Sequence, residues 1–441
     1  MLNKHHIKEY NTSLNRKGLK RICYAPYTSL RFSQSGNIIS CCYNRGYILG
    51  KFPENTIKEV WNSKKLKALQ KNIKKNNLNL GCEICKDRIL GKTFTLTGSF
   101  HYDDLHYYYK SKYPAMLDFE ISNTCNLECI MCTGENSSSI RANRENLTCL
   151  SPIYDSSFVE QLKEFITHIK EARFSGGEPF LNNLYYDIWE LIIKLNPKAK
   201  ITVSTNSTIL NKKIKDLLDK GNFTIAVSID SFTKSTYEKI RQNASFDSVV
   251  ENMKYFYEYS IKHNKPFFIN LCPMPYNWKE IPEIIKICNS KSIKLIFHTI
   301  VFPPKESLWA LDSETLAEIS NFYDDFEFIA NSEIEFFNYS NFKNLKKQIK
   351  TWHSEAIERE KKINLLSSFS YEELLLAFQK HLGENNYDFY QQIMQLINDF
   401  DIKKRERIIN KLFFFHKEAL FSELIHNNTE RLLIKLSMFD Y

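Results

Sequence analysis

The sequence predicts an α/β fold built on parallel β-α-β units, with a different kind of segment on each side. Residues 96–305 alternate short apolar stretches with amphipathic ones, which is typical of parallel strands joined by helices. Residues 20–95 contain five of the eleven cysteines and predict a small α+β domain. Residues 306–441 contain no cysteine and have a helical pattern. A chain of 441 residues is long enough for these three regions to be separate domains.

The elements follow in order. Residues 23–39 predict a hairpin, and apolar residues at 57, 60, 61, 66, 69 and 73 predict an amphipathic helix. The middle region predicts six strands, at 116–121, 172–175, 200–205, 223–229, 267–272 and 293–298. Helices are expected over 158–169, 186–195, 211–219, 246–263 and 281–288. The last region predicts helices at 374–381, 387–400 and 405–415.

The composition is that of an ordinary globular protein, with 43% hydrophobic and 25% charged residues. Sixty basic residues against 51 acidic ones give a net charge of +9, and the short basic runs fit solvated helix faces. We therefore expect no nucleic-acid partner. The first twenty residues do not have a signal-peptide pattern, and no stretch reaches the roughly 18 apolar residues of a membrane helix. The expected location is the cytoplasm, with no membrane association. Cysteines in a cytoplasmic protein indicate metal or redox chemistry and not a disulfide framework.

Three cysteines stand close together directly after the strand predicted at 116–121. Cys125, Cys129 and Cys132 form a C-x3-C-x2-C pattern. Three thiolates at this spacing can bind three irons of a cubane cluster, which leaves the fourth iron open to a ligand. The alternatives are a zinc knuckle or three unrelated core cysteines, although zinc sites usually pair a C-x2-C with a distant second pair.

This loop, with Asn126, Leu127 and Met131, resembles the cluster loop of radical S-adenosylmethionine (radical SAM) enzymes. The resemblance implies a partial (β/α)6 barrel, with the chemistry at the carboxyl ends of its strands. It also implies a [4Fe–4S] cluster whose open iron chelates S-adenosylmethionine. An electron then cleaves that cofactor to a 5'-deoxyadenosyl radical. Met131 stands where the family often places a residue against the adenine, and plain packing is the alternative.

A Gly-Gly-Glu-Pro turn follows the second predicted strand of the middle region, at Gly176, Gly177, Glu178 and Pro179. Paired glycines permit a positive φ and a close approach of the backbone to a ligand. The turn resembles the motif with which the family binds the methionyl amine of the cofactor. An ordinary strand-to-helix turn is the alternative.

The ends of the next two strands carry further polar residues. Asn206 follows Thr205 as in the family's Thr-Asn-Gly, but with Ser207 in place of glycine, and Asn itself tolerates a left-handed turn. Ser228 and Asp230 project to the same side of a strand, where the family contacts the ribose and carboxylate of the cofactor. An N-cap of the following helix is the alternative for Asp230. Arg241 resembles the family's carboxylate-binding arginine, and an exposed helix position is its alternative.

The N-terminal cysteines form a second candidate metal site. Cys23, a spacer, Gly36, four residues and Cys41 resemble the opening of the SPASM/twitch module, which carries auxiliary [4Fe–4S] clusters. With Cys82 and Cys85 they provide four ligands for one closed cluster, and Cys42 is a spare. The module precedes the barrel here, whereas in the family it usually follows. A four-cysteine structural zinc site fits the ligand count equally well.

These features predict a radical SAM enzyme that abstracts hydrogen, with an auxiliary cluster favouring a net oxidation or bond formation. The substrate is expected to be a small polar metabolite or sugar, and the electron donor a flavodoxin- or ferredoxin-type protein. Two alternatives remain open. One is a maturase acting on a side chain of a ribosomal peptide or protein, and the other is a non-catalytic iron–sulfur electron carrier.

Overall fold

The computed structural model describes residues 2–366, 368–383, 387–413, 433–436 and 438. The chain divides into two compact units, Met1–Asn270 and Leu271–Tyr441. Within the described ranges, no helix is both long and apolar enough to span a membrane. The domain boundaries expected at 95 and 305 stay predictions.

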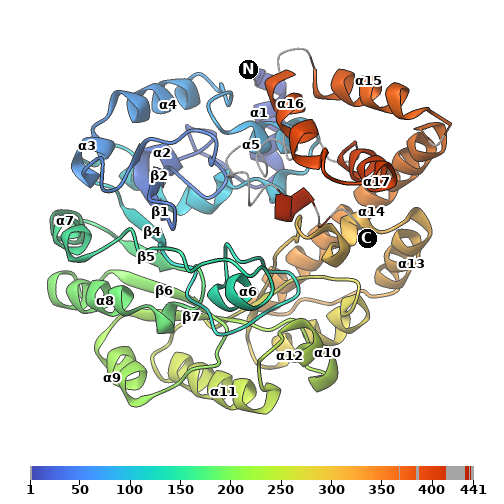
Figure 1. The fold of residues 1–441 in the computed structure, drawn as a ribbon. Helices are drawn as coiled ribbons and strands as arrows, with labels where there is room; N and C mark the ends of the chain where they lie inside the picture. Colours follow the sequence, from blue (N-terminus) through green and yellow to red (C-terminus); the bar gives the residue numbers. More distant parts are fainter. Residues whose placement is uncertain (1, 367, 384–386, 414–432, 437, 439–441) are drawn as a thin grey trace. The chain divides into compact units, whose positions relative to one another are not determined.

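The first unit is organised around one sheet with the strand order β3-β2-β1-β4-β5-β6-β7-β8 (Figure 1). Strands β1, β4, β5, β6, β7 and β8 run parallel, while β1, β2 and β3 are antiparallel neighbours. The predicted N-terminal hairpin is therefore β1–β2, and it joins the same sheet as the parallel units. The strand bounds are Ser29–Ser33 (β1), Asn37–Ile39 (β2), Gly50–Lys51 (β3), Met116–Glu120 (β4), Glu171–Phe174 (β5), Lys200–Thr205 (β6), Phe223–Ser228 (β7) and Phe268–Leu271 (β8).

Helices connect the parallel strands as the alternating pattern predicts, which confirms the α/β class. Figure 1 shows α7, α8, α9 and α11 along one side of strands β5 to β7. The predicted helix through residues 57–73 is two helices, because Ser63 caps a new helix at its N-terminus by accepting a hydrogen bond from the Leu66 N–H. The helix bounds are Lys4–Ser13 (α1), Ala25–Thr28 (α2), Ile57–Trp61 (α3), Lys64–Lys74 (α4), Glu83–Leu90 (α5), Ser138–Asn143 (α6), Ser156–Ile166 (α7), Asn183–Leu195 (α8), Lys212–Lys220 (α9), Lys234–Ile240 (α10) and Phe246–Lys262 (α11), with 3-10 helices at Phe94–Leu96 (η1), Ser99–Tyr108 (η2) and Pro179–Leu181 (η3).

The helix-covered face of the sheet is held by aromatic rings in register. Phe32, Phe119 and Phe174 are direct neighbours on β1, β4 and β5. Their rings stack at centroid distances of 5.3 Å and 4.8 Å. Phe158 of α7 and Trp189 of α8 contact this row edge-on. Burial of these large rings fixes both the strand register and the position of the two helices.

The opposite face of the same strands is polar. Arg31, Asp118, Arg173 and Thr202 are neighbours in one register row, displaced by one residue from the aromatic row. Arg31 donates to Asp118 at 2.5 Å and is also paired with Glu120, the last residue of β4. The sheet therefore has one apolar face under helices and one charged face.

The second unit contains β9 (Lys294–Phe297) and a series of helices, which confirms the predicted helical C-terminal region. A cluster of buried residues from α15, α16 and α17 forms its own core, including Phe378, Ile393 and Ile409. Residues 414–415 of the predicted helix at 405–415 lie outside the described residues. The helix bounds are Ile281–Ser290 (α12), Ser313–Asp324 (α13), Glu333–Leu366 (α14), Tyr371–Leu382 (α15), Tyr387–Ile397 (α16) and Ile402–Leu412 (α17), with 3-10 helices at Trp278–Glu280 (η4), Pro304–Glu306 (η5) and Leu308–Ala310 (η6).

Candidate functional site

The three clustered cysteines lie on the loop that follows β4. Cys129 is buried, while Cys125 and Cys132 are partly exposed. The loop is fixed by its own backbone and by the start of α6: the Cys132 N–H donates to the Cys129 carbonyl at 3.0 Å. The hydroxyls of Ser138 and Ser139 donate to the Cys125 carbonyl at 3.1 Å and 2.9 Å. These hydrogen bonds fix the path of the backbone around Cys125 and Cys132.

The thiols of this loop influence one another. Burial raises the pKa of Cys125 to about 11, and Cys129 adds to this effect. The pKa of Cys129 is raised by a hydrogen bond with Cys132 and then by burial. In the described part of the chain, no three His, Cys, Asp or Glu side chains are grouped as ligands of a single metal ion.

The Gly-Gly-Glu-Pro turn packs directly on the cysteine loop. Gly176 and Gly177 have φ values of +85° and +54°, as the paired glycines predict. A Cβ atom at Gly177 would lie 2.2 Å from the Thr124 carbonyl oxygen, and the Glu178 N–H donates to that same oxygen at 2.7 Å. Only glycine fits this close approach of two backbones. Pro179 begins the short helix η3.

Glu178 is 1% exposed and accepts three hydrogen bonds. Its Oε1 accepts from the Phe180 N–H at 3.1 Å and the Thr205 hydroxyl at 2.8 Å, and its Oε2 accepts from the Asn206 N–H at 2.7 Å. A carboxylate has about four acceptor positions, so one is left for a ligand. Burial raises the pKa of Glu178 to about 7.

Asn206 connects the end of β6 to the cysteine loop. Its Nδ2 donates to Asn126 Oδ1 at 3.1 Å and lies 3.9 Å from Cys125 Sγ. The left-handed residue of this turn is Ser207, with φ +60°, and not Asn206. The turn expected after Thr205 is present, and its left-handed residue stands at the position where the family has glycine.

Asp230 and Arg241 form a buried ion pair after β7, with Arg241 Nε 2.7 Å from Asp230 Oδ2. The N-cap alternative for Asp230 is wrong, because α10 begins after Thr233. The exposed-helix alternative for Arg241 is also wrong, since Arg241 is 7% exposed. The chain beside Arg241 borders the cysteine loop: the carbonyls of Ile240 and Gln242 each accept a loop N–H at 3.0 Å.

Ser228 and Met131 are the two remaining residues that were predicted to contact the cofactor. Ser228, the last residue of β7, is partly buried and paired in register with Asn270. Met131 is partly buried within the cysteine loop, directly before Cys132. Their roles toward a cofactor stay predictions.

The structure also brings the N-terminal cysteines together. Burial raises the pKa of the Cys41 thiol well above its usual range, and the thiols of Cys42, Cys23, Cys82 and Cys85 raise it further. The four predicted ligands are all buried, whereas Cys42 is partly exposed. Burial raises the pKa of Cys42, and the charge of Arg31 opposes that effect.

Two donors to these sulfurs were not predicted from the sequence. The Asn44 amide donates to Cys82 Sγ at 3.0 Å, and the Gly98 N–H donates to Cys85 Sγ at 3.3 Å. A Cβ atom at Gly98 would lie 2.1 Å from Cδ2 of Tyr43, so this N–H approaches the sulfur only because the residue is glycine. Hydrogen bonds to sulfur are characteristic of iron–sulfur sites and adjust their potentials. Cysteine spacing gives no signal for either residue.

Comparison with known families decides what these two sites belong to. Residues 119–288 match the Radical SAM superfamily, and residues 23–86 match the iron-sulfur cluster-binding domain SPASM. The chain contains a radical SAM domain preceded by a SPASM domain. The predicted family and the unusual N-terminal position of the SPASM domain are thereby confirmed. The two domains together imply [4Fe–4S] clusters and S-adenosylmethionine as cofactors.

Curated relatives match over less than half of the chain. A probable GTP 3',8-cyclase of Methanocaldococcus jannaschii is 29% identical over 195 residues, which are 44% of this chain and 60% of the relative. The GTP 3',8-cyclase of Aliarcobacter butzleri is 26% identical over 206 residues, which are 46% of this chain and 61% of the relative.

Solved structures are similar in part. The enzyme anSMEcpe with bound AdoMet is 21% identical, with a TM-score of 0.38 and coverage of 48% of this chain and 60% of the other. SuiB of Streptococcus suis bound to S-adenosylmethionine is 18% identical, with a TM-score of 0.36 and coverage of 60% and 61%.

Proposed function

We propose that this radical SAM enzyme oxidises a small polar molecule, with Cys125, Cys129 and Cys132 as ligands of the cofactor-binding cluster and the four N-terminal cysteines as ligands of a second one. The observation that carries the proposal is the link between the cysteine loop and the Glu178 turn. A single carbonyl oxygen, that of Thr124, accepts the Glu178 N–H, and Gly177 packs against it. The segment with the proposed cluster ligand Cys125 and the segment with the carboxylate proposed for the amine are thus held directly against each other.

The residues around this link have complementary roles in the proposal. Glu178, with one acceptor position left, holds the methionyl amine of S-adenosylmethionine. Asn206 keeps the cysteine loop and the Glu178 carboxylate together through its side chain and its N–H. Arg241, which is already paired with Asp230, supports the cofactor carboxylate side of the site. Ser228 contacts the ribose of the cofactor, and Met131 contacts its adenine.

With a cluster and S-adenosylmethionine bound, an electron cleaves the cofactor and the resulting 5'-deoxyadenosyl radical takes a hydrogen atom from a substrate carbon. The substrate radical must then lose one electron and one proton to become a closed-shell product. Four cysteine ligands leave no open iron, so the N-terminal site suits electron acceptance better than substrate binding. The net reaction is a two-electron oxidation, with a flavodoxin- or ferredoxin-type protein as the electron donor for cofactor cleavage.

Two observations support a polar substrate. The curated relatives are named for GTP, a small polar molecule, although this chain spans only 60–61% of their lengths. The sheet face opposite the helices is polar, as the buried pair of Arg31 and Asp118 shows, and a polar face suits a polar ligand better than an apolar one.

The test is anaerobic purification and reconstitution, followed by iron and sulfide counting and an assay for 5'-deoxyadenosine with dithionite. The comparison is wild type against a Cys125/Cys129/Cys132→Ala triple variant. The proposal expects about eight irons in wild type, about four in the variant, and the nucleoside from wild type alone.

Other outcomes point elsewhere. About four irons plus one zinc, with cleavage intact, would make the N-terminal site structural. Full clusters without cofactor cleavage would favour the electron-carrier alternative. A peptide that copurifies and is modified would favour the maturase alternative.

A further inference from the structure

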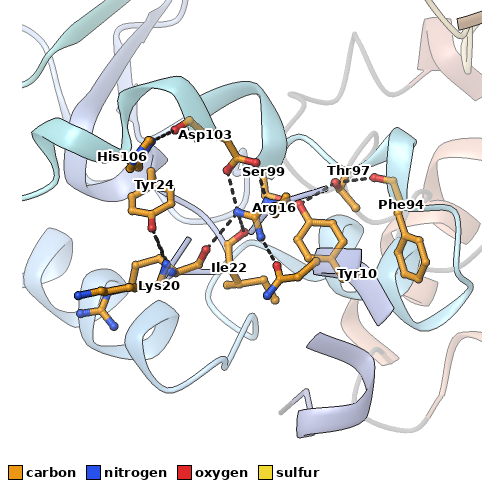
Figure 2. Close-up of polar contacts among 12 residues, drawn as sticks. Tyr10, Arg16, Lys20, Ile22, Tyr24, Phe94, Thr97, Ser99, Asp103 and His106 are labelled. Carbon is orange, nitrogen blue, oxygen red and sulfur yellow. Dashed lines mark hydrogen bonds and ion pairs between the residues drawn. The ribbon is translucent and has the colours of Figure 1, made fainter. Parts of the chain in front are cut away.

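Arg16 and Asp103 form an ion pair outside the segment that matches SPASM, in which the arginine is buried and the carboxylate is partly exposed (Figure 2). Arg16 is 4% exposed, and its Nε and Nη2 donate to the two carboxylate oxygens of Asp103 at 2.5 Å and 2.7 Å. Its Nη1 donates to Asn11 at 2.7 Å, and its guanidinium lies 4.6 Å from the centre of the Tyr10 ring. This two-point geometry fixes the orientation of the arginine.

Arg16 also holds the chain that leads into the first cysteine. Its Nη2 donates to the carbonyls of Arg21 and Ile22 at 3.1 Å and 3.2 Å. These are the two residues before Cys23. The guanidinium therefore sets the path of the backbone directly in front of a proposed cluster ligand.

The partners of Arg16 hold the other side of the cysteine site. Asp103 belongs to η2, and the first residue of that helix, Ser99, shares a 2.6 Å hydrogen bond with the Tyr10 hydroxyl. Gly98, directly before η2, is the residue whose N–H donates to Cys85 Sγ. One network thus joins the segments that position Cys23 and Cys85.

Of the two charges in this pair, the positive one contacts the segment that leads into Cys23. Arg16 donates directly to the carbonyl of Ile22, the residue before Cys23, whereas Asp103 accepts from Arg16. The guanidinium therefore joins Asp103 to this segment and places a cation next to the first cysteine.

We propose that Arg16 and Asp103 are positioning residues of the auxiliary cluster, and that the buried Arg16 charge raises the cluster's reduction potential. Reduction adds one negative charge, and a nearby cation in a poorly solvated site stabilises the reduced state. A higher potential makes the cluster a better acceptor for an electron from a substrate radical. This inference rests on the proposed function of the four N-terminal cysteines.

The test is an EPR-monitored redox titration in the Cys125/Cys129/Cys132→Ala background, so that only the auxiliary cluster titrates. Arg16→Gln is expected to lower the midpoint potential and Asp103→Asn to raise it. Lys92→Gln is the matched control, because it removes one positive charge from an exposed ion pair with Glu9 of α1 and should leave the potential unchanged.

The two shifts in opposite directions separate tuning by charge from simple support of the fold. Shifts in the same direction, or no shift in either variant, would overturn the proposal. Breaking a buried ion pair can destabilise a protein, so Arg16→Lys provides a second comparison in which the charge is kept and a potential near that of the parent is expected. Loss of iron from all three variants of the ion pair (Arg16→Gln, Asp103→Asn and Arg16→Lys), with each protein still folded, would overturn the role of the charge. An iron-free parent would instead refute the auxiliary cluster itself.

Discussion

If Glu178 binds the cofactor amine as proposed, the affinity for S-adenosylmethionine is expected to depend on pH. Burial raises the pKa of this carboxyl group to about 7 in the ligand-free protein. The cofactor amine is a cation, so it binds the ionised form and affinity rises as the pH rises through 7. Between pH 7 and pH 6 the ionised fraction falls from about one half to about one in eleven, which corresponds to a roughly fivefold loss of affinity, or about 1 kcal/mol. The α-amino group of the free ligand stays mostly protonated over this range.

The assay is calorimetric titration of S-adenosylmethionine into the reconstituted protein at pH 6.0, 6.5 and 7.0. Glu178→Gln is expected to bind weakly at each pH, with a much flatter profile. Glu160→Gln is the matched control on the exposed side of α7 and should keep the wild-type slope. A wild-type affinity that does not change with pH, or an equal slope in Glu178→Gln, would refute the reasoning.

Three further predictions follow from the packing. Gly177→Ala places a methyl group on a carbonyl oxygen of the cysteine loop and strains a left-handed residue by about 1–2 kcal/mol, so iron counting should show loss of the cofactor-binding cluster alone. Asp230→Ala removes the carboxylate that is paired with the buried Arg241 and should cost about 3–5 kcal/mol in denaturant melts, whereas Asp247→Ala at an exposed pair should cost much less; equal losses would contradict this. Gly98→Ala forces a methyl group into an aromatic ring and should remove iron only from the N-terminal site. Full iron retention would show that the N–H to Cys85 is dispensable.

Much of the fold could be predicted, because strands and helices alternate along the chain and each has its own regular spacing of apolar residues. The strand at Lys200–Thr205 was predicted with its observed bounds, and the other five strands predicted in the middle region were correct to within one residue at each end. Both groups of cysteines could be recognised as candidate metal sites, because the ligands of a metal site often lie at short, regular spacings in the sequence. The break between α3 and α4 was missed, because the apolar spacing continues through the Ser63 cap.

The parts of the site that were missed depend on tertiary contacts. The pairing of Arg241 with Asp230 joins residues eleven positions apart through the end of a helix, which no local pattern encodes. Arg16 and Gly98 have no motif around them, and their importance comes from segments that fold against Cys23 and Cys85.

The parallel pairing of β1 with β4 limits how the domains of this protein can be expressed separately. Five register pairs join the two strands, so the N-terminal segment supplies one hydrogen-bonded side of the sheet. A chain shortened to begin after residue 95 would leave one edge of β4 without its partner strand, and Phe119 would lose its stacking contact with Phe32. Open strand edges of this kind recruit other chains and aggregate. Attempts to express the barrel alone, or to transplant the cysteine module into another enzyme, would therefore need to carry a covering strand along with the part that is moved.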